Sequence, residues 1–207
     1  MNTRSLLQQA MQQLQQVGVD APRKDAALLL MVAWDISQTS LMVKMMDEVP
    51  EYVVAAFQPL LQRRLKREPI AYILGKKAFW KDEFMVTPDV LVPRPETEHL
   101  IEMVLKYQPN QHAEYKMADI GTGSGCIAVS LAKEYPYSAI AACDISNKAL
   151  AVAKLNAKQL GASQRMTFYE GDLYQALPQG ETYDVIVSNP PYVSQDEMDD
   201  LEAELSF

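Results

Sequence analysis

One short stretch of this sequence combines residue types that suit chemistry on a flat, nitrogen-bearing group. It is the tetrapeptide Asn189-Pro190-Pro191-Tyr192, which follows an apolar run at 185–187. Two consecutive prolines fix the backbone and remove two N–H donors, so the loop offers carbonyl oxygens and the Asn189 amide oxygen as acceptors. Tyr192 adds an aromatic face. The stretch indicates transfer chemistry at an amino or amide nitrogen, and a plain proline-rich turn after a buried strand is the alternative interpretation.

A second stretch is rich in glycine and lies where a predicted strand meets a predicted helix. It comprises Asp119, Gly121, Thr122, Gly123, Ser124 and Gly125. Alternating glycines permit positive φ and close approach of a ligand to the backbone, and the helix that follows presents free N–H groups. Because Cys126 occupies the last position, the pattern is G-x-G-x-G and not the G-x-G-x-x-G dinucleotide fingerprint. Asp119 is expected to accept from an amino group of the ligand.

Acidic residues follow two further predicted strands. A carboxylate at Asp144 can bond both hydroxyls of a ribose, and we expect Ser146 to cap the next helix and leave Asp144 free. After the third strand, Asp172 is placed to accept from an adenine amino group and Leu173 to pack on the ring, although a simple turn explains this pair equally well. Carboxyl ends of adjacent parallel strands share one edge of a sheet, so we expect all these groups to converge there.

The elements that position these residues fall into three predicted regions. Residues 1–73 show apolar positions at helical spacing and predict a small all-α bundle, with helices at 3–17, 22–35, 40–46 and 50–66. Residues 74–92 carry two aromatic and β-branched runs around the polar tripeptide 81–83, which indicates a β-hairpin linker turning at that tripeptide.

Residues 93–207 alternate between strand and helix patterns and predict an α/β domain with a parallel sheet. Its helices are expected at 97–107, 125–135 and 146–160, and its strands at 116–120, 138–143, 165–169 and 183–188. The continuous apolar run at 185–187 indicates a strand covered on both faces.

Composition and charge exclude several kinds of partner. The net charge is −8, and it is uneven: residues 1–75 hold eight Lys/Arg and seven Asp/Glu, whereas residues 76–207 hold eleven and twenty. An acidic second half argues against direct nucleic-acid binding, and the one basic cluster, at 63–67, is interpreted as a solvated helix C-terminus. Neither the two cysteines nor the two histidines have metal-ligand spacing, and the apolar run at 26–34 is too short for a membrane. We therefore expect a cytoplasmic protein without metal or membrane contact.

Taken together, these motifs resemble an S-adenosyl-L-methionine-dependent methyltransferase of the Rossmann-like, seven-strand class. Further motifs narrow the resemblance to the PrmC/HemK family of protein-(glutamine-N5) methyltransferases: Tyr72-Ile73-Leu74-Gly75, Phe79-Trp80, Phe84-Met85-Val86 and the block Val90-Leu91-Val92-Pro93-Arg94-Pro95-Glu96-Thr97-Glu98. The resemblance implies methyl transfer to the glutamine of the Gly-Gly-Gln motif in peptide chain release factors 1 and 2, with S-adenosyl-L-homocysteine as the product.

The resemblance also implies a role for each motif. Residues 121–125 would wrap the methionine part of the cofactor, Asp144 would hold its ribose, and Asp172 with Leu173 would border the adenine. Asn189, Pro190, Pro191 and Tyr192 would hold the substrate glutamine, and Asn189 would also lie next to the cofactor. The helical bundle would be a docking surface for the release factor.

Two alternatives remain open, and one feature departs from the family. The acceptor loop also suits an adenine-N6 methyltransferase that acts on a flipped base of DNA or RNA, and the chain is alternatively a non-catalytic binding module. The family's domain normally continues beyond the point where this sequence stops and supplies further strands. We therefore expect a truncated domain that exposes an unpaired sheet edge and is unstable, self-associated or inactive.

Overall fold

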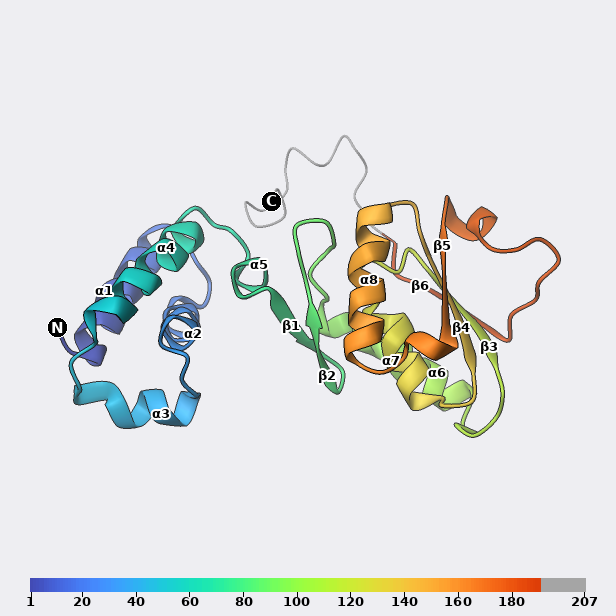
Figure 1. Ribbon diagram of the computed structural model, residues 1–207, viewed down its shortest axis with the longest axis horizontal. Coiled ribbons are helices and arrows are strands. Elements are labelled where there is room, and N and C mark those ends of the chain that lie inside the picture. Colours follow the sequence, from blue (N-terminus) through green and yellow to red (C-terminus); the bar gives the residue numbers. More distant parts are fainter. Residues whose placement is uncertain (191–207) are drawn as a thin grey trace. The chain divides into compact units, whose positions relative to one another are not determined.

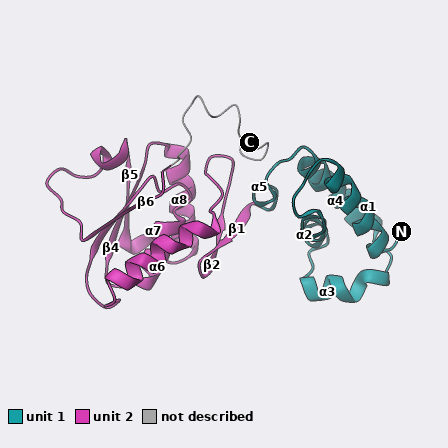
Figure 2. Cartoon of the chain, turned by 180° about the vertical axis from the view of Figure 1, so that it is seen from behind, with its two compact units in different colours: residues 1–74, 195–207 teal, residues 75–194 magenta. Residues whose placement is uncertain are grey.

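In the computed structural model, residues 1–190 of the 207-residue chain are described. The chain divides into two compact units, one formed by Met1–Leu74 and the other beginning at Gly75 (Figure 2). Pro191 and Tyr192, two of the predicted site residues, lie outside the described residues. Within residues 1–190 no single helix has the length and apolar character to cross a membrane, and only the pair Pro22–Trp34 and Gln38–Met46, bent by 101°, meets that test by length and composition.

The first unit is helical (Figure 1). Its elements are α1 (Thr3–Gln16), α2 (Pro22–Trp34), α3 (Gln38–Val43), the 3₁₀ turn η1 (Lys44–Met46), α4 (Glu51–Leu65) and α5 (Ile70–Leu74). Asn2 caps α1 by accepting from the Ser5 N–H at 2.9 Å, and Pro22 fits the first turn of α2, where no N–H is needed. Leu14, Leu29 and Phe57 are fully buried between the helices. The five-residue helix α5 was not predicted, because it is too short to show a helical period.

The basic cluster at the end of α4 is only partly the solvated face that the sequence had suggested, because Arg63 and Lys66 are exposed but Arg64 is buried. Arg64 is 3% exposed, and its Nε donates to Asp25 of α2 at 2.7 Å, while its Nη1 donates to the Glu68 carbonyl at 2.9 Å. Arg67 donates to the Val17 carbonyl at 3.0 Å. Two of the cationic side chains are therefore used to join α4 to the helices and turns before it.

The second unit opens with an antiparallel hairpin of β1 (Lys76–Phe79) and β2 (Asp82–Met85). Phe79 pairs with Asp82, so the chain turns at Trp80 and Lys81 and not at the polar tripeptide 81–83. The turn lies one residue earlier in the sequence than the predicted tripeptide. Trp80 adopts a φ of 55° in it, and a positive φ is not expected from sequence for a bulky residue. Phe79 and Phe84 are both buried in the core of this unit, with ring centroids 6.0 Å apart. The hairpin is therefore part of the α/β unit's core.

A four-stranded parallel sheet forms the rest of this unit (Figure 1). Its strands are β3 (Lys116–Ile120), β4 (Ala139–Asp144), β5 (Met166–Glu170) and β6 (Val185–Ser188), in the order β5-β4-β3-β6. The helices are α6 (Glu98–Tyr107), α7 (Cys126–Glu134) and α8 (Asn147–Gln159), with 3₁₀ turns η2 (Pro95–Thr97), η3 (Ser163–Arg165) and η4 (Leu173–Ala176). The strand order reverses at β3, and open α/β sheets bind ligands at the carboxyl end of such a reversal.

The two faces of the sheet are covered differently. On one face, Met117, Ile140 and Val187 pack in the same buried cluster as residues of α6 and α7. On the other face a smaller cluster of Ala118, Ile120, Ala141 and Cys143 packs with Tyr169, Leu177 and Tyr183. The prediction that β6 is covered on both faces is wrong for the described residues, because Ile186 is 60% exposed. β6 lies at the edge of the sheet formed by these residues. As in any strand, its side chains alternate between the two faces of the sheet, and here one face is packed and the other is open.

Candidate active site

The pairing of the four parallel strands aligns their ends, so that the first residues of four loops lie at one edge of the sheet. Ile120 at the end of β3 pairs with Cys143 of β4 and with Ser188 of β6, and Cys143 pairs with Tyr169 of β5. The residues one step further along each strand are those at 121, 144, 170 and 189. The glycine turn, Asp144, the loop before Asp172 and Asn189 therefore all begin at the carboxyl edge of the sheet.

The glycine turn between β3 and α7 has the backbone that its sequence requires. Gly121, Gly123 and Gly125 have φ values of 73°, 55° and 79°, a region that L-residues with a side chain rarely adopt. A Cβ at Gly125 would lie 3.0 Å from the Cβ of Ala153, so this glycine allows α8 to pack closely on the turn. A Cβ at Gly121 or Gly123 would meet nothing within 4 Å. The turn thus presents backbone and open space at those two positions.

Asp119 lies completely buried beneath this turn. Its Oδ2 accepts from the Thr122 hydroxyl at 2.7 Å and from the Ala128 N–H at 3.2 Å, while its Oδ1 has no hydrogen-bond partner among the described residues. Burial raises the pKa of Asp119 to about 6, and the charge of Asp144 adds to this rise, whereas the two hydrogen bonds oppose it. Asp119 is 0% exposed, and its hydrogen bonds support the glycine turn and the first turn of α7. Its expected contact with a ligand amino group stays a prediction.

Asp144 is partly exposed at the end of β4. As expected, it is not the N-cap of α8, but its carboxylate accepts two hydrogen bonds of its own. Its Oδ2 accepts from the Gly123 N–H and its Oδ1 from the Ser146 N–H, both at 2.9 Å. Ser146 does cap α8, by accepting from the Ala149 N–H at 3.2 Å. Each carboxylate oxygen has a second lone-pair site, so Asp144 retains the capacity to accept from two hydroxyls while it holds the glycine turn.

The loop after β5 is tied to the end of β4. Gly171 donates its N–H to the Asp144 carbonyl at 3.1 Å, and the Cys143 thiol donates to the Leu173 carbonyl at 3.4 Å. Asp172 is exposed, and Leu173 is 52% exposed with a φ of 46°. The apolar side chain of Leu173 is thus exposed beside the carboxylate of Asp172, in a loop that is bonded to the end of β4 where Asp144 lies.

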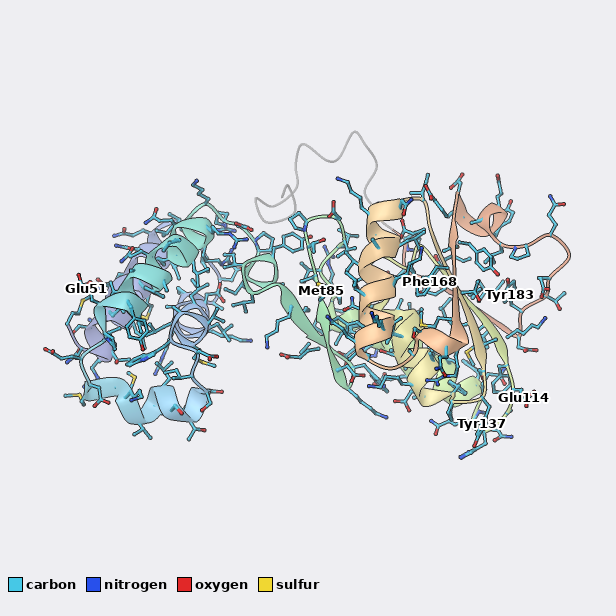
Figure 3. All side chains as sticks on the ribbon, viewed as in Figure 1. Glu51, Met85, Glu114, Tyr137, Phe168 and Tyr183 are labelled. Carbon is cyan, nitrogen blue, oxygen red and sulfur yellow. The ribbon has the colours of Figure 1, made fainter. Side chains whose placement is uncertain are left out.

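Sequence reasoning missed Asn156, a fully buried amide on α8. Its Oδ1 accepts from the Met85 N–H at 2.8 Å, and its Nδ2 donates to the carbonyls of Met85 at 3.0 Å and Ser124 at 2.8 Å. Asn156 therefore ties the hairpin strand β2, whose Met85 is labelled in Figure 3, to the glycine turn. The signal in the sequence was a polar residue within the apolar stripe of a helix, three residues after Ala153 and next to Ala157.

Hydrogen bonds to β3 and to η2 help to position Asn189 and the residue before it, at the end of β6. The Ser188 hydroxyl donates to the Ile120 carbonyl at 2.9 Å and fixes the end of β6 against β3. The Nδ2 of Asn189 donates to the Thr97 hydroxyl at 3.0 Å. Pro190 is exposed. The motif at 90–98, which contains Thr97, contributed to the family resemblance, but its contact with Asn189 was not predicted from the sequence.

Comparison with known proteins agrees with this arrangement. A family model for the PrmC N-terminal domain matches residues 5–75, and one for the methyltransferase small domain matches residues 97–205. Release factor glutamine methyltransferase of Koribacter versatilis is 39% identical over 99% of this chain and 72% of its own length. The proteins of that name from Nitratidesulfovibrio vulgaris and Coxiella burnetii are 41% and 45% identical over 97% and 83% of this chain, and 67% and 61% of their own lengths.

The parallel sheet, its glycine turn and the matching domain model together define a methyltransferase. With relatives of this identity and coverage, the chain belongs to the release factor glutamine methyltransferase family. The resemblance stated from the motifs is thereby confirmed.

Proposed function

We propose that this chain transfers a methyl group from S-adenosyl-L-methionine to the side-chain amide nitrogen of the glutamine in the Gly-Gly-Gln motif of peptide chain release factors 1 and 2. The relatives described above carry release factor glutamine methyltransferase as their name. The observation that carries the proposal is the shared strand edge: the glycine turn follows Ile120, and Asn189 follows Ser188, its partner in the neighbouring strand.

The residues at this edge fit the proposed cofactor. The open space over Gly121 and Gly123 leaves the backbone of the turn accessible to the methionine part. Asp144 keeps acceptor capacity for the ribose hydroxyls, and the exposed Leu173 offers apolar surface for the adenine, with Asp172 beside it as an acceptor. When bound, S-adenosyl-L-methionine supplies the methyl group on a positively charged sulfur.

An amide nitrogen is a weak nucleophile, because its lone pair is delocalised into the carbonyl. Two acceptor atoms of this chain are proposed to compensate for that. Asn189 Oδ1 and the Pro190 carbonyl accept the two N–H groups of the substrate amide and aim its nitrogen. As positive charge develops on that nitrogen, the two oxygens stabilise it more strongly than they do the neutral amide. The N–CH3 bond would form as the S–CH3 bond breaks, S-adenosyl-L-homocysteine would leave, and the methylated nitrogen would release one of its two protons to water. Tyr192 is proposed to hold the amide plane, and it lies outside the described residues.

The charge distribution favours a protein substrate over nucleic acid. Residues 76–207 hold twenty acidic and eleven basic side chains, whereas a phosphate-binding surface needs basic ones. We further propose residues 1–73 as the release-factor docking domain and residues 93–207 as the catalytic domain, in the cytoplasm. The hairpin within residues 74–92 would link the two in sequence while packing in the core of the second unit.

Labelled methyl transfer tests this proposal. The chain is incubated with labelled S-adenosyl-L-methionine and either purified release factor, its Gly-Gly-Gln glutamine→alanine variant, or adenine-containing DNA and RNA. We expect label in the wild-type release factor alone, at a rate that does not fall steeply with salt. Label in nucleic acid would favour the adenine-N6 alternative, and equal labelling of the glutamine variant would refute the proposed substrate atom.

A further inference from the structure

The segment that leads into α6 is held rigidly by its own contacts. Pro93 and Thr97 are buried, and the Thr97 N–H donates to the Arg94 carbonyl at 3.1 Å. The next residue, Glu98, accepts from the Trp80 N–H in the hairpin turn at 2.9 Å through its Oε1. The backbone at Thr97 is therefore fixed by the proline-containing turn η2 and by the hairpin.

The hydroxyl of Thr97 bonds to a distant loop and not to its own helix. Thr97 is the last residue of η2 and directly precedes α6, with φ −67° and ψ −21°. A capping side chain needs an extended backbone, so this hydroxyl makes no capping bond to the first turn of α6. Oγ1 accepts from Nδ2 of Asn189 at 3.0 Å, across 92 positions of sequence. The hydroxyl at the start of α6 therefore contacts the candidate acceptor loop.

We propose that Thr97 is a positioning residue for methyl transfer, which orients the side-chain amide of Asn189. This inference rests on the proposed function. An amide has a donor end and an acceptor end, so holding Nδ2 at Thr97 turns Oδ1 to the other side of the group. The reversed amide would present its NH2 to the substrate NH2, and two donors would then face each other.

Two hydrogen bonds from different elements contribute to the position of Asn189. Ser188 fixes the backbone just before it to β3, through the bond from its hydroxyl to the Ile120 carbonyl. Thr97 fixes the donor end of the side chain from η2. Removing the Thr97 hydroxyl takes away the contact that fixes this donor end, so a small displacement of the acceptor atom is the expected defect.

The kinetic test compares Thr97→Val, which keeps the shape and removes the hydroxyl, with Thr97→Ser, which keeps the hydroxyl. We expect Thr97→Val to lower kcat for release factor about 10²-fold, as for a small misplacement of a catalytic group, with unchanged affinity for S-adenosyl-L-homocysteine. Thr97→Ser should restore most of the rate. Thr3→Val is the matched control, because it removes another fully buried hydroxyl, bonded to the Asp47 carbonyl at 3.2 Å in the helical unit, and should leave kcat unchanged.

A second measurement does not depend on the substrate. The side-chain ¹⁵N–¹H₂ resonances of Asn189 are recorded in the wild type, Thr97→Val and Thr97→Ser, and are assigned by their loss in Asn189→Ala. We expect slow solvent exchange in the wild type and in Thr97→Ser, and faster exchange with a shifted resonance in Thr97→Val.

The outcomes separate the two proposals. If the wild type transfers no methyl group to release factor, the proposed function fails, and the amide resonance still decides whether Thr97 holds Asn189. A wild-type kcat in Thr97→Val, or an Asn189 amide that is unchanged in that variant, overturns the role given to Thr97. A loss of kcat that Thr97→Ser does not restore also overturns it, because the hydroxyl would then not be the cause.

Discussion

The two units use several of their buried polar side chains differently. In the helical unit, Asp25 and Arg64 pair with each other between α2 and α4. In the α/β unit, the buried Thr97, Asp119 and Asn156 all contact loops at the carboxyl edge of the sheet. Burying a polar group without a hydrogen bond is costly. The bonds of the first pair join helices, whereas those of the second group hold the loops of the candidate site.

This difference leads to opposite expectations for substitution. Changing a buried polar group in the helical unit should cost stability and leave the chemistry of the strand edge unchanged. Changing one at the strand edge should alter binding or catalysis more than stability. The predictions below test that contrast.

The largest effect is expected for Asp25→Ala. This substitution removes the Asp25 carboxylate from the nearly buried Arg64 guanidinium, and removing one partner of a buried ion pair typically costs about 3–5 kcal/mol. Urea unfolding should show this loss, while binding of S-adenosyl-L-homocysteine to the folded protein stays unchanged. Asp20→Ala, an exposed aspartate in the same unit, is the control with an expected change near zero. Equal stability of the two variants would show that the pair is not part of the core.

Asn189→Ala is expected to reduce methyl transfer about 10²–10³-fold, as for the loss of one preorganised group facing a developing charge. Affinity for S-adenosyl-L-homocysteine, measured by calorimetry, should remain close to that of the wild type. Asn110→Ala, in the loop before β3 at the other end of the sheet, should behave as wild type. A parallel loss of transfer and of cofactor affinity in Asn189→Ala would contradict the acceptor role.

Asp119→Asn is expected to change the pH dependence of stability. Burial raises the pKa of Asp119 in the folded chain to about 6, above its unfolded value, so the folded state favours the protonated form. The stability that this carboxyl contributes is present below about pH 4 and is lost as the pH rises through about 6. Between pH 4 and pH 7 the unfolding free energy of Asp119→Asn should therefore gain about 2 kcal/mol relative to the wild type.

Urea unfolding across this pH range measures the effect. Asp89→Asn, which removes an exposed carboxyl in the same unit, should run parallel to the wild type. A constant difference between Asp119→Asn and the wild type at all pH values would mean that Asp119 does not titrate in this window.

Gly123→Ala is expected to have the smallest effect. Forcing a Cβ at a φ of 55° costs about 1 kcal/mol, and the added methyl group would project into the open space over the turn. Affinity for S-adenosyl-L-homocysteine should fall about tenfold, or about 1.4 kcal/mol. Gly161→Ala has a similar positive φ and equally open surroundings after α8, so it should cost the same stability without a loss of affinity. Equal affinities would place the cofactor elsewhere.

Much of the fold could be predicted from local patterns. The strands between 116 and 188 lie within about two residues of their predicted bounds, since each is a short apolar run. The helices after β3 and β4 were also readable, because one begins after the glycine turn and the other at the Ser146 cap. The glycine turn was also readable, because positive φ at three alternate positions requires glycine.

What the sequence did not reveal are relations between distant residues. The Trp80 turn depends on Glu98 and Glu134, which accept its backbone and indole N–H at 2.9 and 2.8 Å. The bond between Thr97 and Asn189 has no local signature. The exposure of Ile186 depends on what packs on that face of the sheet, which an apolar run alone does not determine.

The central claim is that the cofactor turn and the Asn189 acceptor act together at one strand edge. A crystal structure of the chain with S-adenosyl-L-homocysteine and a Gly-Gly-Gln peptide tests it most directly. We predict the sulfur over the 121–125 turn and the glutamine amide nitrogen donating to Asn189 Oδ1 on the side facing that sulfur. A peptide bound away from Asn189, or a cofactor bound away from the turn, would contradict the account.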